Sequence, residues 1–115
     1  MKSLFEKLWE LDYFSDLDIH FAKTICDISR QRDPLVLLGA AAASRYTAAG
    51  HVFAPLGELG DQQVMTSTEL SADKWPDTDD WLVALKASEL VGTGDPPTPL
   101  VLEDSNLYLY RYWKY

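Results

Sequence analysis

A row of aromatic residues near the C-terminus is the part of this chain best suited to contact another molecule. Residues 107–113 alternate strictly between two sets, as they would along a β-strand, with the tyrosines on one face. The other face would carry Leu107, Leu109, Arg111 and Trp113. Tyrosine rings can stack on single-stranded bases, although they more often form a packed sheet face or contact a protein. The candidate protein-interface residues are Tyr108, Tyr110, Tyr112 and Trp113.

A second stretch with possible chemistry contains the glycines Gly92 and Gly94. A phosphate-binding loop has the pattern G-x-x-x-x-G-K-[ST], because its backbone N–H groups surround the phosphates and its lysine reaches the terminal ones. No lysine follows these glycines, and Asp95 would repel a phosphate. We therefore interpret the stretch as a turn that ends a helix.

Metal-binding and catalytic groupings are also missing from the sequence pattern. His20 and His51 are the only histidines, they lie far apart in the chain, and Cys26 is the only cysteine. Metal sites require clustered ligands, and nothing here orders a catalytic triad. Asp79 and Asp80 are adjacent, so they would not face each other on a helix and are interpreted as capping residues. We predict no catalytic, cofactor-binding or metal-ligating residue, and no cofactor, for this chain.

The aromatic row is predicted to be one strand of a β-hairpin that spans residues 94–115. Pro96, Pro97 and Pro99 keep the entry extended. Residues 100–102 form the first strand, residues 103–106 are rich in turn formers, and the aromatic row follows. A lone hairpin is only marginally stable in water, so one of its faces must pack against the rest of the chain.

The remainder of the chain is predicted to be mainly helical. Helices are expected over residues 2–13, 19–29, 33–49 and 79–91, with Ser15, Asp16 or Asp18 capping the second. The third begins with Asp33 as N-cap and Pro34 in its first turn, and it ends at Gly50. Its residues 39–43 are all small, so another element can approach closely, and we expect this helix to be the most buried.

These elements predict an α+β fold in a single domain over residues 1–115. Residues 51–53 would add a third strand beside the hairpin, residues 55–59 could open a short helix or turn, and residues 60–77 show no clear pattern. From residue 33 onward the order is helix, strand, helix, helix and hairpin. That order is typical of a winged helix with a small antiparallel sheet, here preceded by two further helices.

The charge balance is acidic, with ten Lys and Arg against eighteen Asp and Glu and a formal net charge of −8. Proteins that bind nucleic acids usually present a basic face, because neutralised phosphates supply much of the affinity. The balance therefore disfavours DNA binding by this chain alone. Seven of the acids lie in residues 58–80 against the single Lys74. This acidic stretch is either a solvated face or a docking surface for a basic partner.

Nothing in the sequence predicts export or a membrane. No apolar run reaches the length of a membrane span, and the acids near the start do not fit a signal peptide. With only Cys26, no disulfide can form within the chain, which suits a reducing compartment. We expect a cytoplasmic location and no membrane contact.

The hairpin region resembles the stretch that precedes the ATPase core in the RecD family, the α subunits of exodeoxyribonuclease V. The matching patterns are GD-x-PTPLVL and LYL-x-RYW within residues 94–113. Weaker matches upstream are Leu17-Asp18 with Phe21-Ala22, the small-residue helix that ends at Gly50, and Gly50-His51-Val52 followed by Pro55-Leu56.

The resemblance implies an N-terminal, non-catalytic domain of a longer helicase subunit. The parent protein would use ATP and magnesium to unwind DNA with 5′→3′ polarity during double-strand-break repair, through an ATPase core beyond Tyr115. Its partners would be RecC-like and RecB-like subunits, with this domain docked on the RecC-like one, and DNA would be bound by the complex rather than by this domain alone.

A different class of function, a free-standing winged-helix DNA-binding module, remains the alternative. A winged helix can place one helix in the major groove. Here that helix would carry Lys86 against several acids, which disfavours phosphate contact. The alternative requires four arginines to converge on one face: Arg30, Arg32, Arg45 and Arg111.

Overall fold

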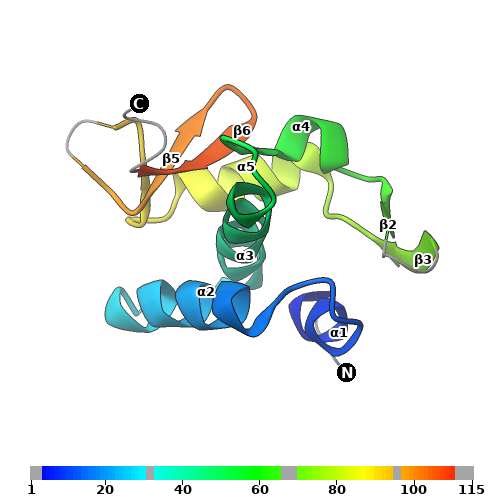
Figure 1. Cartoon of the computed structure of the whole chain (residues 1–115). Coiled ribbons are helices and arrows are strands. Elements are labelled where there is room, and N and C mark those ends of the chain that lie inside the picture. Colours follow the sequence, from blue (N-terminus) through cyan, green and yellow to red (C-terminus); the bar gives the residue numbers. More distant parts are fainter. Residues whose placement is uncertain (1–3, 31–32, 66–69, 95–96, 111–115) are drawn as a thin grey trace.

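Helix α3 (Pro34–Ala48) lies between the N-terminal helices and the C-terminal sheet (Figure 1). The computed structural model describes residues 4–30, 33–65, 70–94 and 97–110. The other helices are α1 (Leu4–Glu10), α2 (Asp16–Ile28), α4 (Leu56–Leu59) and α5 (Thr78–Lys86). The strands are β1 (Ala54–Pro55), β2 (Gln63–Met65), β3 (Leu70–Lys74), β4 (Val91–Gly92), β5 (Leu100–Glu103) and β6 (Asn106–Leu109).

Both ends of α3 form as predicted. The Asp33 carboxylate accepts a hydrogen bond from the Leu35 N–H at 2.9 Å, and Pro34 occupies the first turn. At the other end, Gly50 has a φ of 97°, a conformation that favours glycine. The His51 N–H donates to the Tyr46 carbonyl at 2.9 Å, which closes a Schellman motif after the last turn.

The small residues of α3 allow close approach from both sides, and this confirms that α3 is the most buried helix. Ala40 to Ala43 are completely buried and α2 packs across α3, while α5 and β6 contact α3 as well. At Gly39, an added Cβ would lie 3.1 Å from Leu85 Cδ2 and 3.3 Å from Leu107 Cδ2. These distances are too short for a larger side chain, so α5 and the sheet reach α3 through the space that Gly39 leaves.

A buried polar contact fixes α2 against α3. Of the candidate N-caps, the structure selects Ser15, whose hydroxyl accepts from the Asp18 N–H while the Asp18 carboxylate accepts from the Ser15 N–H. The Asp18 side chain is buried, and its other oxygen accepts from the Ser44 hydroxyl of α3. A capping residue of one helix therefore also joins the two helices.

The hairpin of β5 and β6 is confirmed, with Glu103 paired to Asn106 across a two-residue turn. Asp104 in that turn has a φ of 57°, a left-handed conformation that Asp tolerates better than most residues. Strand β6 ends at Leu109, short of the predicted end at residue 113. The Tyr110 N–H donates to the Pro99 carbonyl at 3.1 Å, and residues 111–113 lie outside the described residues.

A third strand does lie beside the hairpin, but its predicted position at residues 51–53 is wrong. Strand β1 pairs antiparallel with β6 through Ala54 and Leu107. His51 cannot begin the strand, because its N–H is used by the Schellman motif at the end of α3. Val52 is exposed, so the chain reaches the sheet edge only at Ala54.

The sheet is mixed, which corrects the prediction of a small antiparallel sheet. Its strand order is β1-β6-β5-β4, and β4 runs parallel to β5. The prediction that Gly92 ends a helix is also wrong, because α5 ends at Lys86 and Gly92 lies in β4. After α5, the Ser88 hydroxyl accepts from the Leu90 N–H at 3.2 Å, and Leu90 enters the core.

The α+β class is confirmed, whereas the winged-helix arrangement is not. Helix α4 is a single turn, too short for the second helix of such a motif. Residues 60–77, which show no sequence pattern, form a separate two-stranded sheet from β2 and β3. This sheet lies apart from the β5–β6 hairpin in Figure 1 and separates α4 from α5 in the chain.

Candidate protein-docking surface

The face of the sheet that points away from α3 carries an aromatic pair. Tyr108 lies opposite Val101 in the hairpin, and its ring centroid is 5.1 Å from that of Phe53, which precedes β1. Leu107 points the other way and is completely buried beside Gly39. We refer to Phe53 and Tyr108 as the outer sheet face, while Val101 beside Tyr108 is itself completely buried.

The structure places only part of the predicted aromatic row. Tyr108 and Tyr110 are both partly exposed, whereas Tyr112 and Trp113 lie outside the described residues. The predicted alternation holds where it is described, since Leu107 is buried and Leu109 packs against the core. The assignment of these residues to a protein interface stays a prediction.

Sequence reasoning missed the apolar surface that extends the outer sheet face. A cavity of about 510 Å³ lies beside it and is lined by Phe53, Val52 and Pro55 among others. The Val52 side chain is 53% exposed. Because residues 51–53 were predicted to pair as a strand, Phe53 and Val52 had no predicted role at the surface. Their apolar character shortly before Pro55 was the available signal.

Negative charge lies at the edge of the outer sheet face. Burial and the nearby carboxylates of Glu103 and Asp104 raise the pKa of Tyr108 above its ordinary value. The Tyr108 hydroxyl is therefore neutral at physiological pH and carries a proton that it can donate to a partner. A partner that covers this face would meet apolar rings bordered by acids.

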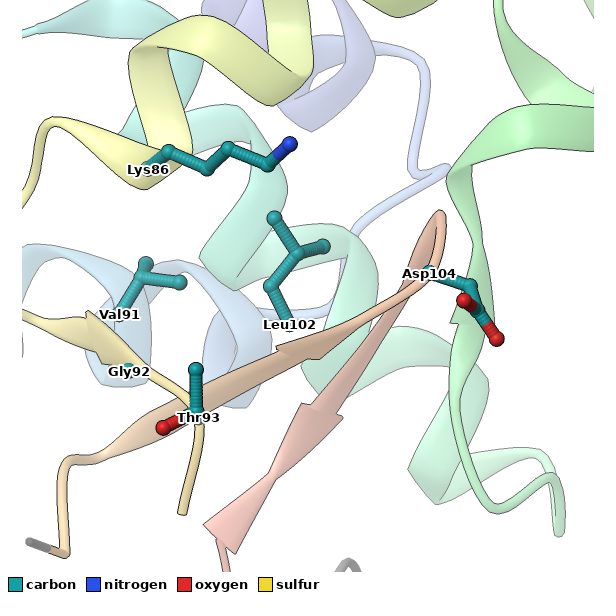
Figure 2. Close-up of a pocket in the computed structure, with 6 residues that line it drawn as sticks. All are labelled: Lys86, Val91, Gly92, Thr93, Leu102 and Asp104. Carbon is teal, nitrogen blue, oxygen red and sulfur yellow. The ribbon is translucent and has the colours of Figure 1, made fainter. Parts of the chain in front are cut away.

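The glycine stretch after α5 lines a different cavity, of about 440 Å³ (Figure 2). Lys86 and Leu102 face the hollow from α5 and β5, and Asp104 lies at the hairpin turn. Gly92 contributes to one wall as part of β4. A single lysine from the preceding helix, near an acid, does not reproduce the backbone arrangement of a phosphate-binding loop.

Of the four arginines required for a DNA-binding face, the two that the structure describes, Arg30 and Arg45, lie apart. Arg45 contacts Tyr13, just before the start of α2, whereas Arg30 follows the end of that helix. A helix of 13 residues is about 20 Å long, so the two cations lie near opposite ends of α2. Arg32 and Arg111 lie outside the described residues. On α5, Asp79 and Asp80 are both exposed, which disfavours contact with phosphates.

Neither a metal cluster nor a membrane span is found in the described ranges. Within residues 4–30, 33–65, 70–94 and 97–110, no group of three or more His, Cys, Asp and Glu side chains is positioned to hold a metal ion. In the same ranges, none of the helices combines the length and apolar character needed to cross a bilayer.

An aromatic column that the sequence did not predict connects the N-terminal helices to α5. The Tyr13 and Trp75 ring centroids are 5.6 Å apart and the rings meet nearly edge to face. Trp75 then stacks on Trp81 at 5.6 Å, and the Trp81 indole N–H donates to the Leu35 carbonyl at 3.0 Å. Trp75 stands alone between Lys74 and Pro76, so no periodic pattern marks it as a core residue.

Because Tyr13 begins this aromatic column, we predict that the domain loses stability at alkaline pH. Burial raises the pKa of Tyr13 to about 12, and the Arg45 guanidinium opposes part of that rise. The folded-state pKa lies above the ordinary value of 10.0, so the stabilisation is fully present below pH 10 and is lost as the pH rises toward 12. Urea titrations should show a larger loss of unfolding free energy between about pH 9 and pH 11 in the wild type than in Tyr13→Phe. Equal losses in the wild type and in Tyr13→Phe would show that ionisation of Tyr13 does not cause the loss of stability.

Comparisons with known proteins identify the family. A family model described as "RecBCD enzyme subunit RecD, N-terminal domain" matches residues 10–108. The chain is 38% identical over 97 residues to "RecBCD enzyme subunit RecD" of Mycobacterium tuberculosis, covering 84% of this chain and 16% of that protein. It is 38% identical over 96 residues to the protein of the same name from Mycolicibacterium smegmatis, with 84% and 16% covered. The corresponding protein of Buchnera aphidicola is 26% identical over 126 residues, with 99% and 19% covered.

Each of these relatives is named as the RecD subunit of the RecBCD enzyme. The chain belongs to the family of RecD N-terminal domains, as the resemblance of residues 94–113 predicted. It spans only 16–19% of the length of these curated relatives.

Proposed function

We propose that this chain is the N-terminal, non-catalytic interaction domain of a RecD-type subunit of exodeoxyribonuclease V. The observation that carries the proposal is the match of residues 10–108 to the RecD N-terminal domain. In this proposal the domain docks on a RecC-like subunit through the outer sheet face and the adjoining residues of the aromatic row. A RecB-like subunit completes the complex, which works in the cytoplasm.

The local chemistry of the domain supports a docking role over a catalytic one. Tyrosine and phenylalanine are enriched in protein interfaces, and Tyr108 and Phe53 lie together on a sheet face beside the exposed Val52. The net charge of −8 disfavours direct contact with DNA. The acidic surface at Asp77, Asp79 and Asp80, which are all exposed, offers a second contact for a basic partner.

The whole subunit is proposed to be an ATP-dependent 5′→3′ DNA helicase that acts in double-strand-break repair. ATP and magnesium would be bound by its ATPase core, outside these 115 residues. In this arrangement the present domain holds the motor in place within the complex and takes no part in ATP hydrolysis itself.

A binding titration tests the proposal. The 115-residue chain is titrated against the RecC-like subunit of the same organism, with labelled single-stranded DNA as a parallel ligand. We expect saturable binding to the subunit and none to DNA. Tyr108→Ala should weaken subunit binding at least about tenfold, because a central interface aromatic commonly contributes more than 1.4 kcal/mol. DNA binding without subunit binding would overturn the proposal in favour of a DNA-binding module.

Leu17→Ala is the matched control for this titration. Leu17 is a 72% exposed apolar residue on α2, which lies on the other side of α3 from the sheet (Figure 1). Its replacement should leave the affinity for the RecC-like subunit unchanged. Equal losses in Tyr108→Ala and Leu17→Ala would assign the effect to general surface apolarity and would contradict docking through the outer sheet face.

A further inference from the structure

A cavity of about 330 Å³ lies between the last turns of α3 and the segment that joins α4 to β2. Tyr13 and Trp75 supply aromatic walls, and Arg45, Tyr46, His51 and Gln62 supply polar groups. The volume falls in the range of small-molecule sites, about 300–1,000 Å³, which typically combine apolar walls with a few convergent polar groups.

The Arg45 guanidinium is held in one orientation inside this cavity. Its Nε–H donates to the Tyr13 carbonyl at 2.9 Å, and its central carbon lies 3.9 Å from the centroid of the Tyr13 ring. These two contacts use one N–H and one face of the guanidinium. The terminal nitrogens carry the remaining N–H donors, which form a planar fork.

That fork has no carboxylate partner among the side chains that the structure describes, since none of them forms an ion pair with Arg45. The Asp18 carboxylate, which influences Tyr13, is already hydrogen-bonded to Ser44 and to the Ser15 N–H. A fixed, partly buried guanidinium with open terminal donors is the arrangement that binds carboxylates in bidentate fashion.

The neighbouring hydroxyl groups suit the same ligand. Burial raises the pKa of both the Tyr13 and the Tyr46 hydroxyl. Both therefore remain neutral donors at physiological pH. Tyr46 also contacts the His51 ring, with the ring centroids 5.4 Å apart. The polar end of the cavity thus presents N–H and O–H donors around the one arginine.

We propose that this cavity binds a carboxylate group at the Arg45 guanidinium, with the apolar body of the ligand against the aromatic wall that Tyr13 and Trp75 form together. A single negative charge matches a single guanidinium. Among the described residues that line the cavity, Arg45 is the one Lys or Arg that a dianionic phosphate would meet, and the carboxylates of Asp18 and Glu58 act on the two tyrosines from nearby. The carboxylate comes either from a free small acid or from a Glu side chain of a partner polypeptide. The site is separate from docking through the outer sheet face and does not depend on it.

An NMR titration of the isotope-labelled chain with benzoate tests the proposal. Benzamide has the same shape without the charge, so it is the matched ligand. We expect benzoate to shift the signals of the Arg45 Nε–H, the Gln62 side-chain amide and the Trp75 indole, with benzamide at least about tenfold weaker, because a charged hydrogen-bonded pair contributes about 1.5–3 kcal/mol. Equal binding of the two ligands, or benzoate shifts confined to other residues, would overturn the carboxylate assignment.

The source of the carboxylate is distinguished by a second pair of probes, the blocked tripeptides Gly-Glu-Gly and Gly-Gln-Gly. Binding of the Glu peptide at the same signals, with the Gln peptide about tenfold weaker, assigns the site to an acidic side chain of a partner. Benzoate binding without peptide binding assigns it to a free small acid. If neither benzoate nor the Glu peptide shifts the signals of Arg45, the proposal is wrong.

An arginine variant gives an independent check. Arg45→Lys keeps the charge and loses the planar fork, so benzoate binding should weaken about tenfold while the benzoate preference over benzamide decreases. Lys23→Gln, on α2 outside this cavity, is the control and should bind benzoate as the wild type does. If Arg45→Lys does not fold, because the contacts of Arg45 with Tyr13 are lost, the comparison of benzoate with benzamide on the wild type still decides the question.

Discussion

Trp81→Ala is expected to lower the free energy of unfolding by about 3–5 kcal/mol, the range for aromatic-to-alanine changes in cores. Trp81 is completely buried, stacks on Trp75 and donates its indole N–H to the Leu35 carbonyl. Its removal leaves a cavity where α3 and α5 meet and deletes the hydrogen bond from the indole N–H to the Leu35 carbonyl. Because small domains are stable by only about 5–15 kcal/mol, we expect a large decrease in the denaturant midpoint with little change in slope.

Two further variants test which interactions of Trp81 cause this loss of unfolding free energy. Trp81→Phe keeps an aromatic ring and removes the N–H donor, so it should cost less than the alanine change and isolates the loss of the hydrogen bond to the Leu35 carbonyl. Val83→Ala is the control on the same helix, since Val83 is 67% exposed, and it should change stability by less than about 0.5 kcal/mol. Similar losses in Trp81→Ala and Val83→Ala would contradict the packing described for α5.

Gly39→Val is expected to destabilise the domain by about 1–3 kcal/mol through overpacking. A Cβ at this position already lies 3.1 Å from Leu85 and 3.3 Å from both Leu107 and the Trp81 indole nitrogen, and valine adds two methyl groups beyond it. Gly39→Ala should be milder, because the gain in helix propensity of about 1 kcal/mol offsets the tighter contact. Thermal or urea unfolding of the two variants measures the difference.

A double mutant shows whether steric overlap causes the effect. Leu85→Ala removes the side chain that lies nearest to the added Cβ. In the Gly39→Val background, Leu85→Ala should therefore cost less than it does in the wild type, with a coupling energy of about 0.5–3 kcal/mol. Additive losses would mean that the two residues do not share the space described.

The helices and the main hairpin were predictable because their signals are local. For α3, a capping Asp, a Pro in the first turn and a Gly after the last turn mark both ends, and each makes the contact expected of it. Strand β4 was not predictable, because it has only two residues and owes its existence to pairing with β5. The end of α5 was misplaced for a related reason, since Leu90 continues the apolar pattern of the helix but reaches the core after a turn.

The candidate sites likewise combine residues that a local pattern identified with residues that only the folded chain brings together. Alternation identified the partly exposed Tyr108 and the buried Leu107, because period two follows directly from strand geometry. Phe53 joins Tyr108 only through the pairing of β1 with β6, which no local pattern shows. The cavity at Arg45 is built from α3, the segment between α1 and α2, and the residues around the β2–β3 sheet, so its parts meet only in the folded chain.

The pairing of β1 with β6 also determines when this domain can fold on the ribosome. Ala54 has its ladder partner in Leu107, and the same leucine fills the space beside Gly39. Helices α1 to α3 leave the exit tunnel long before Leu107 does, so the nascent chain exposes one side of α3 until almost the whole domain has been translated. Such late, long-range contacts slow folding, and nascent-chain proteolysis should show protection of α3 appearing only once β6 has emerged.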